Sequence, residues 1–408
     1  MKIMGLQMGK KYITREDLQT LRYGSIMIMT DQDHDGSHIK GLLINFIHFF
    51  WPDLIMRHKE FLKEFITPII KVTKKKDQGS EKLAFFTIPE YERWAEDRIR
   101  ENSLRNYTIK YYKGLGTSTS LEAKEYFKAI ESHRIRFFYR DAHDDDAIDL
   151  AFNKKKADNR KDWLSNYDPK IFVDHNLKDL RLLDFINREL IHFSNADNLR
   201  SIPSVIDGFK PGQRKILFAC FKRKLKAEIK VAQLSGYVAE HSAYHHGEVS
   251  LSQTIVGMAQ DFVGSNNINL LKPIGQFGNR MMGGKEAASP RYIFTNLTSL
   301  ARLVFHPNDN SVLNYQVEEG QRIEPDYYAP ILPMCLINGA EGIGTGWSTS
   351  IPCYNPLEIA DNIRKRLRNH AYNFRRMIPW FRGFTGKIEL KEDGTNYLVQ
   401  GSFERIPS

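Results

Sequence analysis

Cysteine and long hydrophobic runs are both scarce in this chain. Its three cysteines, Cys220, Cys335 and Cys353, are too few to stabilise a fold of 408 residues through disulfide crosslinks. Their positions also lack the spacing of metal ligands. No run reaches the roughly 18 apolar residues of a membrane helix, because the longest candidate, Gly41–Ile55, contains several polar residues and a proline. The first residues also lack the architecture of a signal peptide. The sequence therefore predicts a protein of a reducing compartment, cytosol or nucleus, with no membrane partner.

The chain carries many charges of both signs, with a moderate excess of positive charge. The chain has 59 lysines and arginines against 49 aspartates and glutamates, a net charge of +10. Such an excess suits a polyanionic partner such as nucleic acid, although a solvated surface explains it equally well. With 41% hydrophobic residues, the chain has enough apolar material for two or three domains, and wholesale disorder is excluded.

The first part of the sequence has an α/β pattern. Gly24–Met29 is typical of a short buried strand, and the apolar stretch Ile39–Phe50 of a helix that Trp51-Pro52 would perturb. Phe65–Val72 is expected to form one strand, paired through a hairpin with Leu83–Ile88.

Later segments change in character. The highly charged Asp141–Asp162 is expected to lie at the surface or to connect domains, since blocks of like charge rarely enter cores. From Ser201 the pattern is helical, with a basic cluster over Lys210–Lys230 and an amphipathic helix over Leu251–Val263.

An acidic loop follows the first predicted strand. Asp31, Asp33 and Asp35 alternate along the chain and precede Gly36. Carboxylates so close together repel one another, so a divalent cation is expected to compensate them. A calcium-binding EF-hand is excluded because Leu42 stands where that loop needs glutamate. Oxygen ligands at the end of a strand suit Mg²⁺ and phosphate chemistry, and a solvated turn explains three alternating aspartates poorly.

Three other patterns carry less weight. Lys113–Ser118 lacks the spacing of a Walker phosphate loop, and Gly339–Gly346 lacks the third glycine of a dinucleotide fingerprint. A zinc site among His241, His245 and His246 is not favoured, because no cysteine completes it and Glu248 is the only near carboxylate.

Six blocks that follow one another along the chain strongly resemble the eukaryotic DNA topoisomerase II family, which is of type IIA. They are Thr30–Gly41, Tyr112–Ser118, Asp207–Lys215, Ala243–Glu248, Pro290–Ile293 and Asn338–Thr349. The acidic loop alone indicates only a Toprim-type metal fold, which some primases and nucleases share. The Arg-Tyr block at 291–292 makes the resemblance much more specific.

The resemblance implies a multidomain α/β plus α+β fold. It divides the chain into a Toprim metal-binding domain over 1–150 that lacks its N-terminal part, a connecting segment over 151–199, a winged-helix DNA-binding domain with the catalytic tyrosine over 200–330, and the start of a tower domain over 331–408. The family's ATPase region, its Glu-Gly-Asp-Ser block with a metal-ligand glutamate, and its coiled-coil exit gate have no counterpart here. The chain is therefore expected to be an excised cleavage core.

The implied function is that of an ATP-dependent type II DNA topoisomerase, an isomerase of the nucleus. In this family a homodimer cuts both strands of double-stranded DNA, passes a second duplex through the gap and reseals it. ATP would be used only by the full-length protein. Two alternatives stay open, namely a DNA-binding core that is catalytically incomplete and another Toprim nuclease or primase.

The resemblance also assigns residues. Tyr292 corresponds to the nucleophile that holds the 5′ phosphate, and the groups around that phosphate are Arg291, Arg200 and His246. The metal ligands are Asp31, Asp33 and Asp35, which would hold two Mg²⁺ ions with Mn²⁺ able to substitute, and which in the family act on the tyrosine of the other copy in the dimer. The expected DNA contacts are Lys113, Lys210, Arg214, Lys215 and His245, with Ile351 as a wedge between base pairs.

Overall fold

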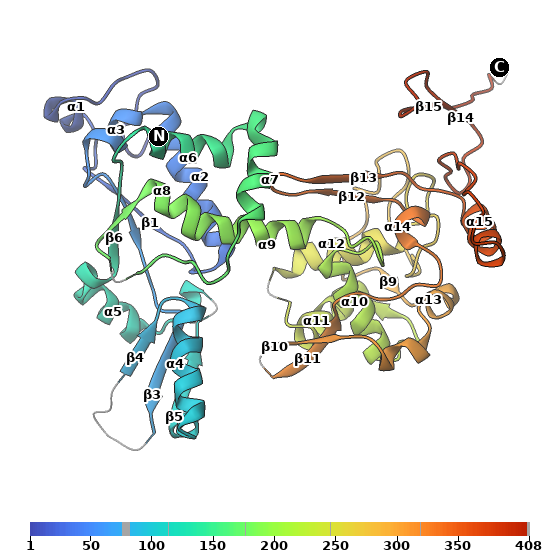
Figure 1. Cartoon of the computed structure of the whole chain (residues 1–408), viewed down its shortest axis with the longest axis horizontal. Helices are drawn as coiled ribbons and strands as arrows, with labels where there is room; N and C mark the ends of the chain where they lie inside the picture. The colour runs from blue at the N-terminus through green and yellow to red at the C-terminus, as the bar shows by residue number, and fades with distance from the viewer. Residues whose placement is uncertain (76–81, 113, 176, 245, 319, 406–408) are drawn as a thin grey trace. The chain divides into compact units, whose positions relative to one another are not determined.

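The computed structural model describes residues 1–75, 82–112, 114–175, 177–244, 246–318 and 320–405 (Figure 1). The chain divides into two compact units, Met1–Asp197 and Asn198–Ser408. Each unit has its own buried hydrophobic cluster. No helix within the described ranges is both long enough and apolar enough to cross a bilayer.

A four-stranded mixed sheet forms the centre of the first unit, in the order β1-β2-β6-β7. Its strands are β1 (Ile26–Met29), β2 (Leu62–Phe65), β6 (Arg134–Phe138) and β7 (Asp179–Arg181). Strands β1 and β2 are parallel, so the chain must cross over between them. The crossover consists of α2 (His34–Phe50) and α3 (Pro52–Arg57), which are separate helices because Trp51-Pro52 interrupts them as predicted.

A second, antiparallel sheet in this unit has the order β4-β3-β5. It consists of β3 (Ile70–Lys74), β4 (Lys82–Phe85) and β5 (Tyr107–Tyr111). The pairing of β3 with β4 confirms the predicted hairpin. The single strand expected over Phe65–Val72 is wrong, since β2 and β3 belong to different sheets. Pro68 lies between them and has no N–H for a ladder.

The helices of the first unit surround these sheets. They are α1 (Arg15–Gln19), α4 (Ile88–Arg100), α5 (Ser120–Lys128), α6 (Ala142–Phe152), α7 (Ala157–Ser165), α8 (Leu182–Phe185) and the π-helix η5 (Ile186–Leu190). Short 3₁₀ turns lie at Leu104–Asn106, Leu115–Thr117, Ile130–Ser132 and Lys154–Lys156. The segment predicted to connect domains thus packs into the first unit, because Leu182, Phe185, Ile186 and Leu190 are all within its core.

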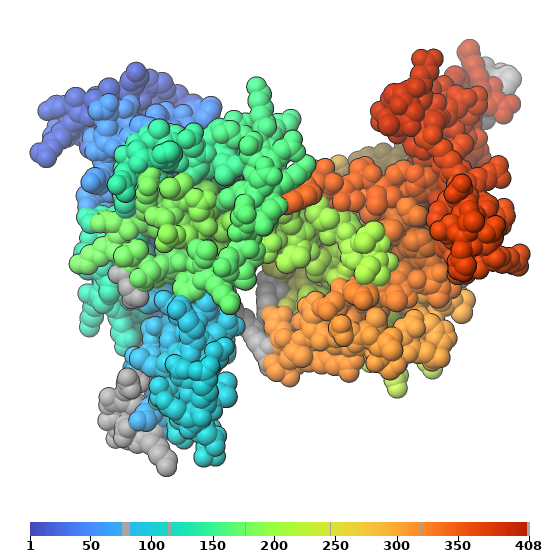
Figure 2. All heavy atoms as spheres, in the orientation of Figure 1, coloured from blue at the N-terminus to red at the C-terminus, as the bar shows by residue number. Residues whose placement is uncertain are grey.

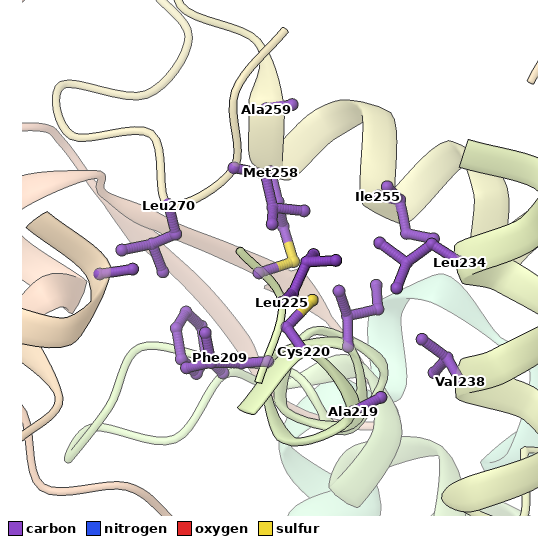
Figure 3. Packing of buried hydrophobic residues seen from close by; sticks show 14 of the residues in the cluster. Phe209, Ala219, Cys220, Leu225, Leu234, Val238, Ile255, Met258, Ala259 and Leu270 are labelled. Carbon is purple, nitrogen blue, oxygen red and sulfur yellow. The ribbon is translucent and has the colours of Figure 1, made fainter. Parts of the chain in front are cut away.

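Three helices make the core of the second unit. They are α10 (Pro211–Lys222), α11 (Val231–His241) and α12 (Glu248–Ala259), and Figure 3 shows their side chains meeting around Cys220, Leu234 and Met258. The short strands β8 (Ile229–Lys230) and β9 (Phe294–Thr295) pair beside them. All three cysteines are free and buried, and burial raises the pKa of the Cys220 thiol to about 12.

The remaining elements of the second unit are mostly hairpins and short helices. They are α13 (Ser299–Val304), the 3₁₀ turn η6 (Pro307–Ser311), β10 (Tyr315–Glu318) with β11 (Gln321–Pro325), α14 (Met334–Ile337), β12 (Ala340–Ile343) with β13 (Ser348–Ile351), α15 (Pro356–Arg368), and β14 (Lys387–Leu390) with β15 (Tyr397–Gln400). Helix α9 (Ile191–Ser201) crosses the boundary between the units. Figure 2 shows the C-terminal residues of the second unit, in red, as a protruding part of that unit.

Candidate DNA-cleavage site

Tyr292 lies on a segment whose backbone is fixed on both sides. The N–H groups of Val231 and Ala232, at the start of α11, donate to the carbonyls of Ile293 and Pro290, each at 3.0 Å. Ile293 is buried with 1% exposure, whereas Tyr292 is 70% exposed. The buried neighbour and the two backbone bonds hold the segment in place, so the phenol is presented to solvent from a rigid support.

Arg291 stands beside this tyrosine and at the edge of a hollow. Its guanidinium carbon is 5.7 Å from the centroid of the Tyr292 ring. The hollow, of about 660 Å³, lies between α12 and the segment 283–291, and its lining includes Ser252, Gln253 and Lys285. A guanidinium at this place can bind a phosphate next to the phenol through its planar fork of donors.

Arg200 and His246 belong to the same unit as Tyr292. Arg200 is half-buried in the last turn of α9, and His246 is exposed just before α12, with its ring 5.6 Å from that of Tyr244. The predicted DNA contact His245 lies outside the described residues, as does Lys113 of the first unit. The phosphate-binding roles of Arg200 and His246 stay predictions.

The glycine-rich segment 339–346 forms a hairpin that packs on the end of α9. A Cβ at Gly342 would lie 2.2 Å from the carbonyl oxygen of Ser201, and a Cβ at Gly344 would lie 2.1 Å from Asn198 Oδ1. The Asn198 amide also donates to the Thr345 carbonyl at 3.0 Å. These glycines therefore allow the β12–β13 hairpin to approach α9, the helix that carries Arg200. This close approach gives a structural reason for the glycine-rich segment, which does not match a dinucleotide-binding fingerprint.

Ile351, the predicted wedge, is the last residue of β13. It pairs with Ala340 across the hairpin and is half-buried. Its insertion between base pairs stays a prediction.

The acidic loop connects β1 to α2 in the first unit. Asp33 is the N-cap of α2, and its Oδ1 accepts a hydrogen bond from Gly36 N at 2.7 Å. A side chain at Gly36 is excluded, because its Cβ would lie 1.9 Å from the carbonyl oxygen of Asp31. The loop geometry thus depends on the Asp-Gly pattern that is evident in the sequence.

A second glycine brings another motif to the same place. A Cβ at Gly114 would lie 2.8 Å from Asp31 Oδ1, so the loop that begins at 114 packs directly against this carboxylate. The structure therefore brings together two blocks that are about eighty residues apart in the sequence. Lys113 itself is outside the described residues.

The role of the three aspartates as metal ligands stays a prediction. Asp31 and Asp33 are exposed and Asp35 is half-buried. Among the described residues, no group of three or more His, Cys, Asp or Glu side chains is placed to hold a metal ion. The carboxylates suit a divalent cation chemically.

A buried lysine behind the acidic loop was missed by sequence reasoning. Lys40 Nζ lies 2.7 Å from Glu64 of β2 and 2.5 Å from Glu189 of η5, and Ser37 Oγ donates to Glu189 at 2.8 Å. Burial lowers the pKa of Lys40, but the two carboxylates outweigh it and the net shift is upward. The signal in the sequence that could have identified Lys40 as buried was a lysine within an otherwise apolar helix. This network ties the first turns of α2 to the sheet and to η5.

The basic cluster is only partly a surface feature. Arg214 is 5% exposed, and its Nε and Nη2 donate to the two oxygens of Asp207 at 2.7 and 3.0 Å. Lys215 Nζ contacts Glu324 at 2.8 Å and the Ser242 carbonyl. Both charges are thus paired inside the unit, and the prediction that Arg214 and Lys215 bind the DNA backbone stays a prediction. Lys210, half-buried at the start of α10, stays a candidate.

The second unit thus combines an exposed tyrosine beside an arginine with a three-helix core and short paired strands, and the first unit is an α/β unit with an acidic loop. Residues 200–407, half of the chain, match the family of the A-type subunits of DNA gyrase/topoisomerase IV, and residues 65–198 match the C-terminal associated domain of TOPRIM. The chain belongs to this DNA gyrase/topoisomerase IV family.

Relatives with similar sequences are named DNA topoisomerase 2. The chain is 56% identical over 415 residues to DNA topoisomerase 2 of Drosophila melanogaster and 56% identical over 405 residues to that of Saccharomyces cerevisiae. Each alignment covers 99% of this chain but 28% of the relative. The chain thus spans little more than a quarter of these relatives.

A solved structure is similar over the whole chain. The DNA-binding, cleavage and re-ligation domain of Plasmodium falciparum topoisomerase II is 55% identical, with a TM-score of 0.77, and the match covers all of this chain and 54% of that one. This likeness confirms the predicted fold class, a Toprim-type α/β unit combined with a winged-helix unit. The Toprim-associated match also fits a requirement for a divalent metal.

Proposed function

We propose that this chain is the cleavage core of a type II DNA topoisomerase, which cuts double-stranded DNA and reseals it. The Tyr292 phenol oxygen loses its proton and attacks a backbone phosphorus, the bond from phosphorus to the 3′ oxygen breaks, and the 3′ oxygen takes up a proton and leaves as a hydroxyl. The 5′ phosphate stays on Tyr292, so the bond energy is kept and the 3′ hydroxyl can attack in return. The observation that carries this proposal is the exposure of Tyr292 on a fixed backbone.

The neighbouring cations have distinct roles in this proposal. A phenol is a weak nucleophile at neutral pH, and negative charge increases on the phosphate as the phenol oxygen attacks. Arg291 is placed to bind the non-bridging oxygens, and we assign Arg200 and His246 to the same phosphate. Charge on the departing 3′ oxygen would be stabilised by a divalent cation, for which we propose Mg²⁺ with Mn²⁺ as a substitute.

The assembly and location follow from the same proposal. A double-strand cut needs two tyrosines, so we infer a homodimer on duplex DNA. ATP would be required only in the full-length protein, for strand passage. We place the protein in the nucleus, where its proposed substrate is found.

The test is covalent capture of DNA. The chain is incubated with end-labelled duplex and Mg²⁺, then denatured, and a protein adduct on the 5′ ends is measured. Wild type is expected to give the adduct and Tyr292→Phe to lose it, while Tyr327→Phe, at another exposed tyrosine of the same unit, keeps it.

Two other results would contradict the proposal. Tight binding of duplex without an adduct would favour a DNA-binding scaffold. Free cut ends that Tyr292→Phe leaves unchanged would favour another Toprim nuclease.

A further inference from the structure

The segment 114–119, which we call the Gly114 loop, lies against the acidic loop of the first unit. A Cβ at Gly114 would lie 2.8 Å from Oδ1 and 2.9 Å from Cγ and Oδ2 of Asp31. The Gly114 loop continues through a 3₁₀ turn, in which Thr117 N donates to the Gly114 carbonyl at 3.0 Å, and it ends at Thr119, the N-cap of α5. Because its backbone is so close to the Asp31 carboxylate, any shift of the Gly114 loop changes the space available to that side chain.

One carboxylate, that of Glu122, is bonded to the chain on both sides of the Gly114 loop. The N–H and the hydroxyl of Thr119 donate to Glu122 Oε2 at 2.8 and 3.0 Å, which closes the capping box of α5. On the other side, the hydroxyl of Tyr112 donates to Glu122 Oε1. Tyr112 is two residues before Gly114, so Glu122 connects the strand that leads into the loop with the residue at which the loop ends.

Tyr112 is itself held in place by strands β3 and β5. Its N–H donates to the Ile69 carbonyl at 2.8 Å, and the residue is only 8% exposed. Lys110 Nζ and Lys71 Nζ lie 4.4 and 5.5 Å from the centroid of its ring. Both lysines also pair with Glu122, at 3.1 and 3.5 Å respectively. The Tyr112 hydroxyl is therefore kept on Glu122 by the surrounding sheet.

Glu122 is ionised at neutral pH, although its side chain is only 17% exposed. Burial raises the pKa of Glu122, but the hydrogen bonds from Thr119, Tyr112 and Lys110 outweigh it, so the net shift is downward. Hydrogen bonds to a charged acceptor are stronger than those to a neutral one. Removal of this single carboxylate would therefore release Tyr112 and Thr119 together.

We propose that Glu122 is a positioning residue for the acidic loop. By holding Tyr112 and Thr119, it keeps the Gly114 loop against Asp31 and so orients that carboxylate for a divalent cation. Groups behind a metal ligand change metal affinity without touching the ion, because they fix the orientation of the ligand. The inference rests on the proposed function, since the cation belongs to the cleavage chemistry.

The test is binding of Mn²⁺ to the full chain in the absence of DNA. Free Mn²⁺ is measured by electron paramagnetic resonance, and binding that Asp31→Asn removes is assigned to the acidic loop. Glu122→Ala is expected to weaken this binding about tenfold, and Tyr112→Phe, which leaves every charge in place, about threefold. The Mg²⁺ concentration for half-maximal adduct formation should rise by the same factors, with the maximal adduct unchanged.

Three further variants separate the positioning role from other effects. Asp17→Ala removes the carboxylate of an equivalent capping box, closed by Thr14 at the start of α1, and Tyr111→Phe removes the hydroxyl of the exposed neighbour of Tyr112. Neither is expected to change Mn²⁺ binding. Glu122→Gln can keep the capping box and a hydrogen bond to Tyr112 without the charge, so its affinity should stay within about twofold of wild type.

Three results would overturn the inference. The first is wild-type affinity for Mn²⁺ in Tyr112→Phe and in any folded Glu122→Ala. The second is a Glu122→Gln that binds as weakly as Glu122→Ala, because the charge alone would then act on the cation. The third is the lack of any Mn²⁺ binding that depends on Asp31. Failure of the proposed function looks different, since wild type would then bind Mn²⁺ through Asp31 but form no adduct with DNA.

Discussion

Asp33 shows how one residue can serve both the fold and the chemistry. Its carboxylate caps α2 through Gly36 N, and it also lies in the loop that we propose helps to bind a divalent cation. The two roles can be separated, because asparagine caps a helix about as well as aspartate but carries no charge.

Asp33→Asn is therefore expected to fold normally but to need more metal. We expect the Mg²⁺ concentration for half-maximal DNA cleavage to rise at least about tenfold, since the loss of one anionic ligand costs on the order of 1.4 kcal/mol or more. Cleavage titrated with Mg²⁺, together with thermal unfolding, measures both effects. Asp168→Asn is the matched control, because Asp168 also accepts from a backbone N–H but lies in another loop. An unchanged Mg²⁺ midpoint in Asp33→Asn would remove this aspartate from the metal site.

Single residues also show where sequence reasoning stops. The type and spacing of Asp31, Asp33 and Asp35 were enough to select them, whereas Tyr292 was selected only by the family resemblance of the block around it. The role of Arg214 could not be seen, because a basic residue in a basic cluster looks the same whether it faces DNA or Asp207. Lys215 is harder still, since its partner Glu324 is 109 residues away. Only tertiary packing reveals such pairs.

At the scale of elements, the start of α6 contradicts the expectation of a solvated acidic block. Asp144 is fully buried, accepts from the N–H groups of Arg140, Asp141 and Leu183, and pairs with Arg181. Its carboxylate thereby joins α6 to the start of α8. The sequence could not show this, because Asp145 and Asp146 beside it have the same charge and Asp146 is exposed.

This arrangement predicts a pH-dependent contribution to stability. Burial raises the pKa of Asp144, but the three N–H donors and Arg181 outweigh it, so the net pKa is below the ordinary value. The ionised group thus stabilises the fold above about pH 4, and this contribution is lost as pH falls through the lowered pKa.

Asp144→Asn is accordingly expected to cost about 2 kcal/mol of unfolding free energy at neutral pH, and the difference from wild type should shrink toward about pH 3. Urea unfolding at a series of pH values measures it. Asp146→Asn, an exposed change in the same helix, is expected to follow wild type throughout. A constant difference between Asp144→Asn and wild type would show that the carboxylate charge is not what stabilises this junction.

Element boundaries show a similar division between local and distant information. The hairpin of β3 with β4 and the break at Trp51-Pro52 follow from local rules, and both were predicted. The separation of β2 from β3 into two sheets depends on what each strand pairs with, which no local pattern contains.

At the scale of the whole molecule, the proposed chemistry needs groups from both units. Tyr292 and Arg291 belong to the second unit and the acidic loop to the first. If the cooperating tyrosine and aspartates come from different copies of the chain, as the family resemblance implies, each of the two sites in a homodimer uses one unit of each chain. Mixed dimers distinguish this arrangement from one in which each chain is self-sufficient.

Two mixed dimers are compared, each carrying Tyr292→Phe and Asp31→Asn once. With the two changes on different chains, a shared site keeps one intact pair, namely the wild-type tyrosine of one chain and the wild-type aspartate of the other. This dimer is expected to nick one strand and form one adduct. With both changes on one chain, each shared site loses a member, so neither strand should be cut. Wild-type dimers, cutting both strands, are the control on the same gel. The reverse pattern, with nicking only when both changes are on one chain, would show that tyrosine and aspartates act within a single chain, because that dimer would then keep one wholly wild-type site.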